Sequence, residues 1–454
     1  ENGASATSLF LNVGRNGGTG TLLVTGLGSQ LTLSGVGVPF VNNNVSNFPA
    51  SMIVGWNGST GHATVSNGGQ VLITDAGGDG RASTGSPTLF VGRDLGSQGS
   101  LAITGAGSKV EILSTSLGLP AGTADNYNPY MSVGGRDANT SGQLTITNGG
   151  VLQLTGHALS TSSFFRGTNF YVGGNSDTLL GGTGTVSISG VGSALRVEGV
   201  DAFVGVGVNG TGTMTLSDHA LLSTGVINVG RAASGVGALL VDNSQISLNG
   251  QQTGNTAVGA VMTIGNRGGN GAVTFANGSL MTITNLGSAG ASVNIGGTGL
   301  NPLGHGQLTL TGGSQILVNA APGLATFSVG LDGTAFASLS GASLVDIGTG
   351  VTHVGRLSGG SGTLGLSGGS KLMAGQVNIG GSSDTVAGGL GTATVSGIGS
   401  ELSASGASGF IGVGRRGIGT LSVANQGKVA AITMSVGRSA GGVGTLSVNN
   451  ATLE

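Results

Sequence analysis

Pairs of carboxylates are the side chains of this sequence best suited to acid–base chemistry. Asp332 and Asp346 lie within one stretch of the chain, and Asp201 and Asp218 lie on either side of a Val-Gly dipeptide at residue 206. Two carboxyl groups about 5–10 Å apart in a cleft can hydrolyse a glycosidic bond. In an enzyme built from repeats we expect such groups to recur at equivalent positions, and neither pair does. The carboxylates therefore predict no catalytic site, so a polysaccharide lyase or hydrolase is the weakest function left open.

Metal and cofactor sites have equally little support. The chain has no cysteine, and its five histidines show no ligand spacing such as His-x-x-x-His. Glycine makes up 97 of the 454 residues, so Gly-x-Gly-x-x-Gly strings arise by composition and indicate no nucleotide site. A formal net charge of −2 gives no electrostatic case for binding nucleic acid or an anionic membrane. We expect no cofactor, no metal, no nucleic-acid partner and no membrane insertion by this chain.

Arginine is the charged residue with a regular position. Six arginines directly follow a Val-Gly dipeptide: Arg15, Arg93, Arg231, Arg356, Arg415 and Arg438. Cations stacked roughly 5 Å apart repel one another unless each is hydrogen-bonded, so we expect carbonyls or aspartates as partners. Trp56 follows Val-Gly in place of arginine, which indicates that any large flat side chain fits over the turn. We predict a structural corner; a basic stripe that binds anionic polysaccharide is the alternative.

The dipeptide before these arginines is the anchor of a repeat that fills the chain. A Val-Gly or Ile-Gly pair begins at residues 13, 54, 91, 133, 172, 206, 229, 264, 295, 329, 354, 379, 413 and 436. After a glycine-rich turn comes a Gly-Thr-Leu-x-Val segment, as in Gly20-Thr21-Leu22-Leu23-Val24. The shortest spacing separates the anchors at 206 and 229 and those at 413 and 436. Fourteen such units indicate a repeat architecture.

Each unit contains three short stretches in which apolar and polar residues alternate, at 11–13, 22–24 and 31–33 in the first unit. Alternation places the apolar side chains on one face. Strands this short are stable only when stacked, and three of them in so short a unit make one coil of a parallel β-helix. We therefore predict an all-β parallel β-helix, or β-solenoid, of about fourteen coils with three short strands each. At roughly 4.8 Å per coil the stack would be about 65 Å long.

A two-sheet sandwich and a β-propeller are the competing folds. A sandwich gives no reason for a recurring anchor, and a unit as short as that from 206 to 229 cannot hold a propeller blade. We expect a single continuous solenoid over residues 1–454. Longer insertions follow the third strand in residues 1–171, at 35–51, 75–89, 114–131 and 157–170, and should emerge along one edge. The coils in 200–454 should be more regular.

The repeat resembles those in passenger domains of bacterial autotransporters and related type V secreted surface proteins. The residues that carry the resemblance follow the pattern V-G-R-x-G-x-G-T-L-x-V-x-G-x-G-S-x-L, seen best at 91–108, 184–193 and 413–423. The likeness spans nearly the whole chain and implies export to the bacterial cell surface. It implies nothing about an activity. The membrane-embedded barrel and the capping segment that the family leads us to expect are not visible in this sequence.

The two ends of the sequence suggest self-assembly. Residues 1–10 read as a third strand leading into the first anchor, and residues 451–454 stop partway through another third strand. Joining the two ends would separate Val436 from Val13 by a distance along the chain that lies within the observed range of anchor spacings. We therefore expect a head-to-tail homopolymer. Its expected interface residues are Ser8, Leu9, Phe10, Leu11, Leu446, Val448 and Leu453.

Aromatic residues gather in the insertions of the first half. They are Phe40, Phe48, Tyr127, Tyr130, Phe164 and Phe165. A flap that packs on its own coils is one interpretation, and a lateral binding edge for a sister molecule, a glycan or a host surface is the other. The sequence thus predicts a non-enzymatic, extracellular structural protein that assembles into a surface filament for adhesion, matrix or biofilm. A monomeric adhesin passenger that binds a glycan or host protein is the alternative.

Overall fold

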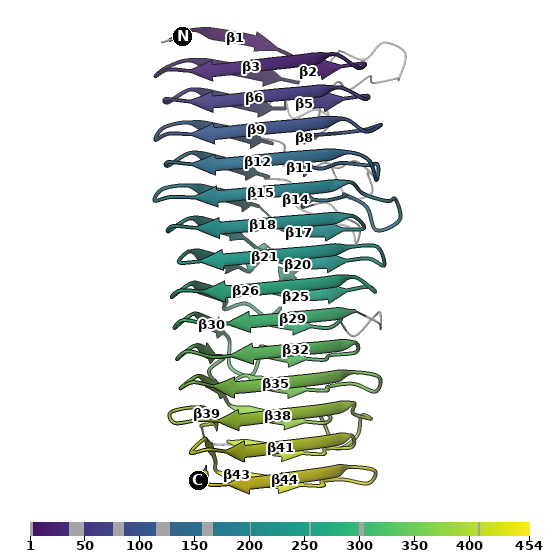
Figure 1. Cartoon of the computed structure of the whole chain (residues 1–454), viewed down its shortest axis with the longest axis vertical. Coiled ribbons are helices and arrows are strands. Elements are labelled where there is room, and N and C mark those ends of the chain that lie inside the picture. Colours follow the sequence, from purple (N-terminus) through teal and green to yellow (C-terminus); the bar gives the residue numbers. More distant parts are fainter. Residues whose placement is uncertain are drawn as a thin grey trace. The chain divides into compact units, whose positions relative to one another are not determined.

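The computed structural model describes residues 3–35, 50–75, 86–114, 128–156, 167–199, 201–253, 256–298, 304–406 and 409–454. All regular structure in these residues is β-strand, and none of them forms a helix long and apolar enough to cross a membrane. The chain forms two compact units, Glu1–Val226 and Ile227–Glu454. Within each unit the strands of successive coils lie one beside the next in three parallel sheets (Figure 1). We number the sheets 1 to 3 in the order in which each coil visits them.

In the first unit each coil contributes one strand to each sheet. Sheet 1 contains β2 (Phe10–Arg15), β5 (Ser51–Trp56), β8 (Thr88–Val91), β11 (Tyr130–Val133), β14 (Asn169–Val172) and β17 (Phe203–Val208). Sheet 2 contains β3 (Thr19–Thr25), β6 (Thr60–Ser66), β9 (Gln98–Thr104), β12 (Ser141–Thr147), β15 (Thr183–Ser189) and β18 (Thr211–Ser217). Sheet 3 contains β1 (Ser5–Ser8), β4 (Gln30–Ser34), β7 (Gln70–Thr74), β10 (Lys109–Leu113), β13 (Val151–Thr155), β16 (Ala194–Glu198) and β19 (Leu221–Thr224).

The second unit repeats this arrangement. Sheet 1 contains β20 (Val226–Arg231), β25 (Ala260–Asn266), β28 (Ala291–Ile295), β31 (Ala325–Val329), β34 (Val351–Val354), β37 (Gln376–Ile379), β40 (Phe410–Val413) and β43 (Thr433–Val436). Sheet 2 contains β21 (Val236–Asp242), β26 (Asn270–Ala276), β29 (His305–Leu310), β32 (Thr334–Leu339), β35 (Ser361–Ser367), β38 (Leu390–Ser396), β41 (Ile418–Ala424) and β44 (Val443–Asn449). Sheet 3 contains β22 (Gln245–Asn249), β27 (Leu280–Asn285), β30 (Gln315–Ala320), β33 (Leu344–Asp346), β36 (Lys371–Ala374), β39 (Glu401–Ala404), β42 (Lys428–Ala431) and β45 (Thr452–Leu453). A short antiparallel hairpin, β23 (Gln251–Thr253) and β24 (Thr256–Val258), lies outside the three sheets.

The predicted all-β parallel solenoid with three strands per coil is confirmed, and the sandwich and propeller alternatives are wrong. Each predicted anchor lies in a strand of sheet 1, with its Val or Ile side chain facing the interior. All of these side chains are at most 4% exposed except that of Val436 in the last coil. In most strands of sheets 2 and 3 buried and more exposed positions alternate as expected, with apolar side chains such as Leu144 and Ile146 in the bore.

The anchor requires glycine because two coils approach closely at this corner. At Gly355, φ is +67°, a left-handed conformation that disfavours any residue with a Cβ. A Cβ at this position would also collide with the carbonyl oxygen of Leu390 in the next coil. The glycine of the Gly-Thr-Leu segment is restricted in the same way. In the coil that follows, a Cβ at Gly391 would collide with the carbonyl oxygen of Val354. Glycine content thus reflects backbone packing between coils.

The turns from sheet 2 to sheet 3 alternate between two forms in the first unit. The longer form occupies residues 26–29 between β3 and β4, and the shorter form occupies residues 67–69 between β6 and β7. The long form recurs at 105–108 and 190–193, and the short form at 148–150. The two forms bond to each other: Gly68 N donates to Ser108 Oγ at 3.0 Å, and Gly149 N donates to Ser193 Oγ at 3.0 Å. The packing period of this corner is therefore two coils.

The strand bounds place the predicted insertions between sheet 3 and sheet 1, because β4, β7, β10 and β13 end before them and β5, β8, β11 and β14 begin within their last two residues. Among the turns that the structure describes throughout, those at 173–182 and 380–389 are lengthened after the anchor. Both turns contain the sequence Gly-x-Ser-Asp-Thr. Their serines, Ser176 and Ser383, accept hydrogen bonds from the backbone amides two and three residues later. The same local structure therefore forms in both units.

Candidate functional site

The arginine corner of the first unit is a stack of flat side chains on three successive coils. The Arg15 guanidinium carbon lies 4.5 Å from the centre of the Trp56 ring, and that of Arg93 lies 5.3 Å from it. Trp56 Nε1 donates to Asp94 at 3.2 Å, and Arg93 Nε lies 3.1 Å from the same carboxylate. Cation–π contact and the shared aspartate offset the repulsion between the two guanidinium groups.

The corner of the second unit is organised by one carboxylate. Asp384, in the lengthened turn, accepts hydrogen bonds from Arg415 Nε at 2.9 Å and Nη2 at 3.2 Å. Arg438 Nη2 lies 3.0 Å from the same carboxylate, and Ser439 Oγ donates to it at 2.6 Å. The hydrogen bonds from Arg415 and Ser439 hold the pKa of Asp384 well below its ordinary value. Phe410 lies against both guanidinium groups, at 5.5 and 5.3 Å from its ring centre.

The other corner arginines are partly withdrawn from water. Arg231 is only 7% exposed, and burial lowers the pKa of Arg356. Arg356 lies in the turn after β34, the strand that contains His353, and burial together with this neighbouring cation lowers the pKa of His353 to about 3. The His353 imidazole is therefore neutral at physiological pH.

The aromatic side chains form a ladder on the outer face of sheet 1 in the first unit. Phe90, Tyr130, Tyr171 and Phe203 lie on successive coils with ring centres 5.4–5.6 Å apart. Tilted rings at these distances attract one another. Burial raises the pKa of the Tyr130 hydroxyl. Tyr130 is the one member of the predicted lateral edge that the structure describes; Phe40, Phe48, Tyr127, Phe164 and Phe165 lie outside the described residues.

The residues expected at the subunit interface lie in the end coils. Ser8 is in β1, which pairs with β4, and Leu9 joins it to β2, which contains Phe10 and Leu11. Leu446 and Val448 lie in β44, and Leu453 lies in β45. In the last coil the inward side chains are partly open to water: Val448 is 43% exposed, whereas its partner in the preceding coil, Val423, is fully buried. Leu453 likewise is 41% exposed over a buried Val429.

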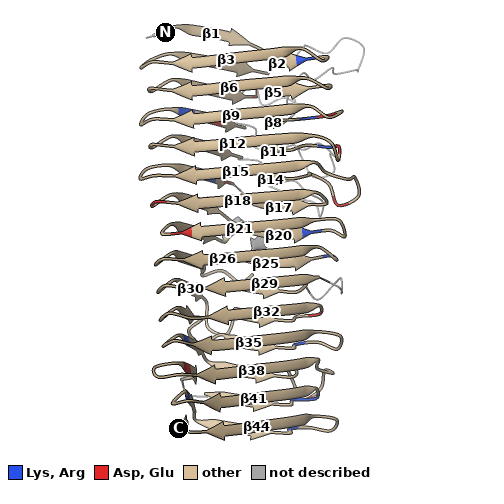
Figure 2. Cartoon of the chain, viewed as in Figure 1, with Lys and Arg blue, Asp and Glu red and all other residues tan. Residues whose placement is uncertain are grey.

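The two aspartates of each predicted carboxylate pair lie in different strands or turns. Asp332 lies in the turn after β31, at the corner between sheets 1 and 2, whereas Asp346 lies in β33 of sheet 3. Asp346 accepts a hydrogen bond from Gly348 N at 2.9 Å. In the described part of the chain, no three His, Asp or Glu side chains are grouped as metal ligands would be. Figure 2 shows blue and red at scattered points on the ribbon, chiefly at turns and strand ends.

Sequence reasoning did not identify Asp384 as the centre of the arginine corner. Its signal was the Gly-x-Ser-Asp-Thr turn that occurs at 174–178 and again at 381–385. No protein-family model and no curated protein sequence matches the chain.

Proposed function

We propose that the chain is a structural β-solenoid protein of the bacterial cell exterior, whose coils continue from one copy to the next in a head-to-tail filament. The parallel stacking of like coils carries this proposal, because in each sheet a strand presents the same edge to the next coil. Val448 and Leu453 stand at positions where the preceding coil buries its side chains completely. One further coil would remove this apolar surface from water, at about 25 cal/mol per Å². A second copy of the chain would supply such a coil in the proposed filament.

Backbone pairing supports the same mode of assembly. In each sheet every strand pairs in parallel with the strands of neighbouring coils, and the outer edge of β44 presents unpaired amide and carbonyl groups. The first coil offers a matching parallel edge through β1, β2 and β3. A head-to-tail contact between unlike ends does not close on itself, so it gives an open filament. The likeness of the repeat to autotransporter passengers supports placement at the cell surface, in adhesion, matrix or biofilm.

Negative-stain microscopy of the purified chain at several concentrations tests the proposal. We expect thin fibres that lengthen as concentration rises. In the variant Val448→Lys a cation replaces an inward apolar side chain at the open end, so fibres should be lost. Ser447→Lys is the matched control, because Ser447 is exposed and, as the neighbour of Val448 in β44, points to the opposite face of the strand. Isolated particles of the wild type at every concentration, or fibres from Val448→Lys equal to those of Ser447→Lys, would refute the filament and leave the monomeric adhesin.

A further inference from the structure

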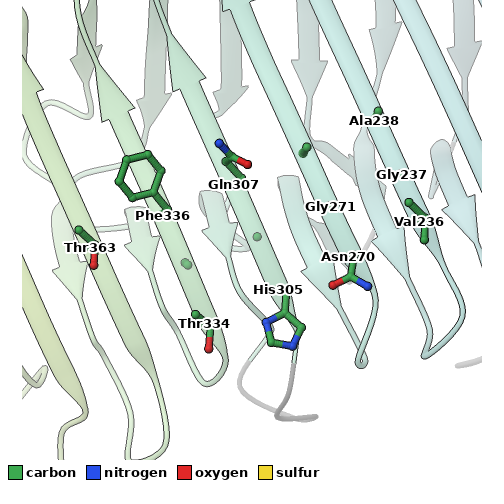
Figure 3. Close-up of a pocket in the computed structure, with 13 residues that line it drawn as sticks. Val236, Gly237, Ala238, Asn270, Gly271, His305, Gln307, Thr334, Phe336 and Thr363 are labelled. Carbon is green, nitrogen blue, oxygen red and sulfur yellow. The ribbon is translucent and has the colours of Figure 1, made fainter.

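A shallow groove crosses the outer face of sheet 2 in the second unit. It spans β21, β26, β29, β32 and β35 and has a volume of about 630 Å³. Figure 3 shows side chains from neighbouring strands standing on this face, with Asn270, His305 and Thr334 near the strand starts and Gln307 and Phe336 farther along. At roughly 4.8 Å between strands, the groove is about 19 Å long in the direction across the strands.

The groove exists because one outward column changes size from coil to coil. Ala238, Ala272, Gln307, Phe336 and Thr363 occupy equivalent positions on successive strands. The two alanines form a low floor, and Gln307 and Phe336 rise beside it. In the following coils this column returns to threonine, at Thr392, Thr420 and Thr445. The change is thus local to these strands.

Phe336 has no role in the core that would explain its presence. Its side chain is 43% exposed on the outer face, whereas Phe275 and Phe327 in the same unit are completely buried. An exposed aromatic ring offers a flat apolar platform. Beside the small side chains of Ala238 and Ala272, such a ring is suited to contact with a flat apolar surface of a ligand.

The polar side chains around the ring are free to bond to a ligand. Within the described residues, no side-chain hydrogen bond engages Asn270, His305, Gln307 or Thr334. Their amide, imidazole and hydroxyl groups supply both donors and acceptors. None of the residues that line the groove is Lys, Arg, Asp or Glu. A fitting ligand is therefore uncharged, rich in hydroxyl groups, and apolar on one face.

We propose that this groove binds a neutral oligosaccharide. The C–H face of a sugar ring lies on Phe336, and the sugar hydroxyls bond to Gln307, His305 and Asn270. The groove is longer than one sugar ring, so the ligand extends across several coils. A small-ligand site usually combines an apolar surface with a small number of directional polar groups. This binding is independent of the filament proposal, because the groove lies on a sheet face and the filament contact lies at coil ends.

Affinity electrophoresis of the full chain tests the proposal, with laminarin and dextran as neutral polysaccharides and polygalacturonate as the anionic one. We expect a neutral polysaccharide to slow the wild type. Phe336→Ala should weaken the retardation at least tenfold, and Phe336→Trp should preserve it. Ala272→Trp, which fills the floor, should abolish it. Leu390→Ala is the matched control, because Leu390 is 46% exposed on the same sheet but outside the groove.

Four results would overturn the proposal. The first is the absence of retardation by both neutral polysaccharides, and the second is retardation by polygalacturonate alone. The third is retardation that Phe336→Ala and Ala272→Trp leave unchanged. If Ala272→Trp instead abolishes a self-association seen without polysaccharide, the groove is occupied by a second copy of the chain and the proposal is wrong. Fibre formation should be the same in wild type and Phe336→Ala, so failure of either proposal can be seen separately.

Discussion

Replacing the anchor glycine Gly355 by alanine should destabilise the second unit strongly. The residue has φ of +67°, and a Cβ there would collide with Leu390 O, part of the backbone of the next coil. The left-handed conformation alone costs a residue with a Cβ about 1–2 kcal/mol. Relieving the overlap by moving a paired strand adds about 1–3 kcal/mol, as for other overpacked sites. Together we expect a loss of about 2–5 kcal/mol of unfolding free energy.

Two other glycines of the same unit separate these contributions. Gly278 has φ of +76°, but a Cβ at this position would meet no atom within 4 Å, so Gly278→Ala should lose only about 1–2 kcal/mol. Gly365 has neither a positive φ nor a neighbour within 4 Å of a Cβ, so Gly365→Ala should be neutral or up to about 1 kcal/mol stabilising.

Urea unfolding at 25 °C, followed by far-ultraviolet circular dichroism and extrapolated to zero urea, measures the three differences. Hydrogen exchange of the β38 amides shows whether the Gly355→Ala loss is centred on the strand that the methyl group contacts. The reasoning is refuted if Gly355→Ala costs no more than Gly278→Ala. In that case conformation alone, and not the close approach of coils, would account for glycine at the anchor.

Two predictions concern acid. The pKa of buried His353 is about 3 against an ordinary 6.5, so the unfolded chain binds the extra proton and stability falls as pH drops from 6.5 towards 3. The variant His353→Asn copies Asn378 at the equivalent position of the next coil. It should reduce the dependence of unfolding free energy on pH by up to about 1.4 kcal/mol per pH unit, measured by urea unfolding at pH 7, 5.5 and 4. An unchanged pH dependence would contradict this prediction. Asp384 has a lowered pKa, so its contribution is complete above the ordinary 3.8 and is lost as pH falls below that value. Asp384→Asn should lower the melting temperature at pH 7, and this difference should shrink at pH 3; a constant difference would show that the arginine contacts do not stabilise the fold.

The coil could be predicted from sequence because its signals are local. Alternation such as Leu22 and Val24 depends on neighbours two residues apart, and each anchor lies a few residues from its Gly-Thr-Leu segment. Residue type also carried information, because a glycine that recurs after Val or Ile marks a backbone position where a Cβ does not fit. These signals need no knowledge of which coils stack in which register.

The side-chain clusters could not be predicted because they depend on register between coils. Asp384 contacts Arg415 and Arg438 only because the two following coils place those arginines over its turn. The groove likewise needs Ala272 and Phe336 in one column, and insertions between strands hide that alignment in the sequence. The neighbours of Tyr130 could not be predicted for the same reason. Its ring partners lie in the preceding and following coils, and the insertion lengths obscure which residues become neighbours.

The two-coil period of the corner in the first unit has a consequence for how such a chain can change length. Long and short turns alternate there, and Ser108 and Ser193 of the long turns accept hydrogen bonds from Gly68 and Gly149 of the preceding short turns. Recombination that removed one coil would bring two long or two short turns together and change the partners of these two amides. Loss or gain of coils in pairs would keep every such bond. Genes for this kind of array should therefore drift in length by even steps along this stretch.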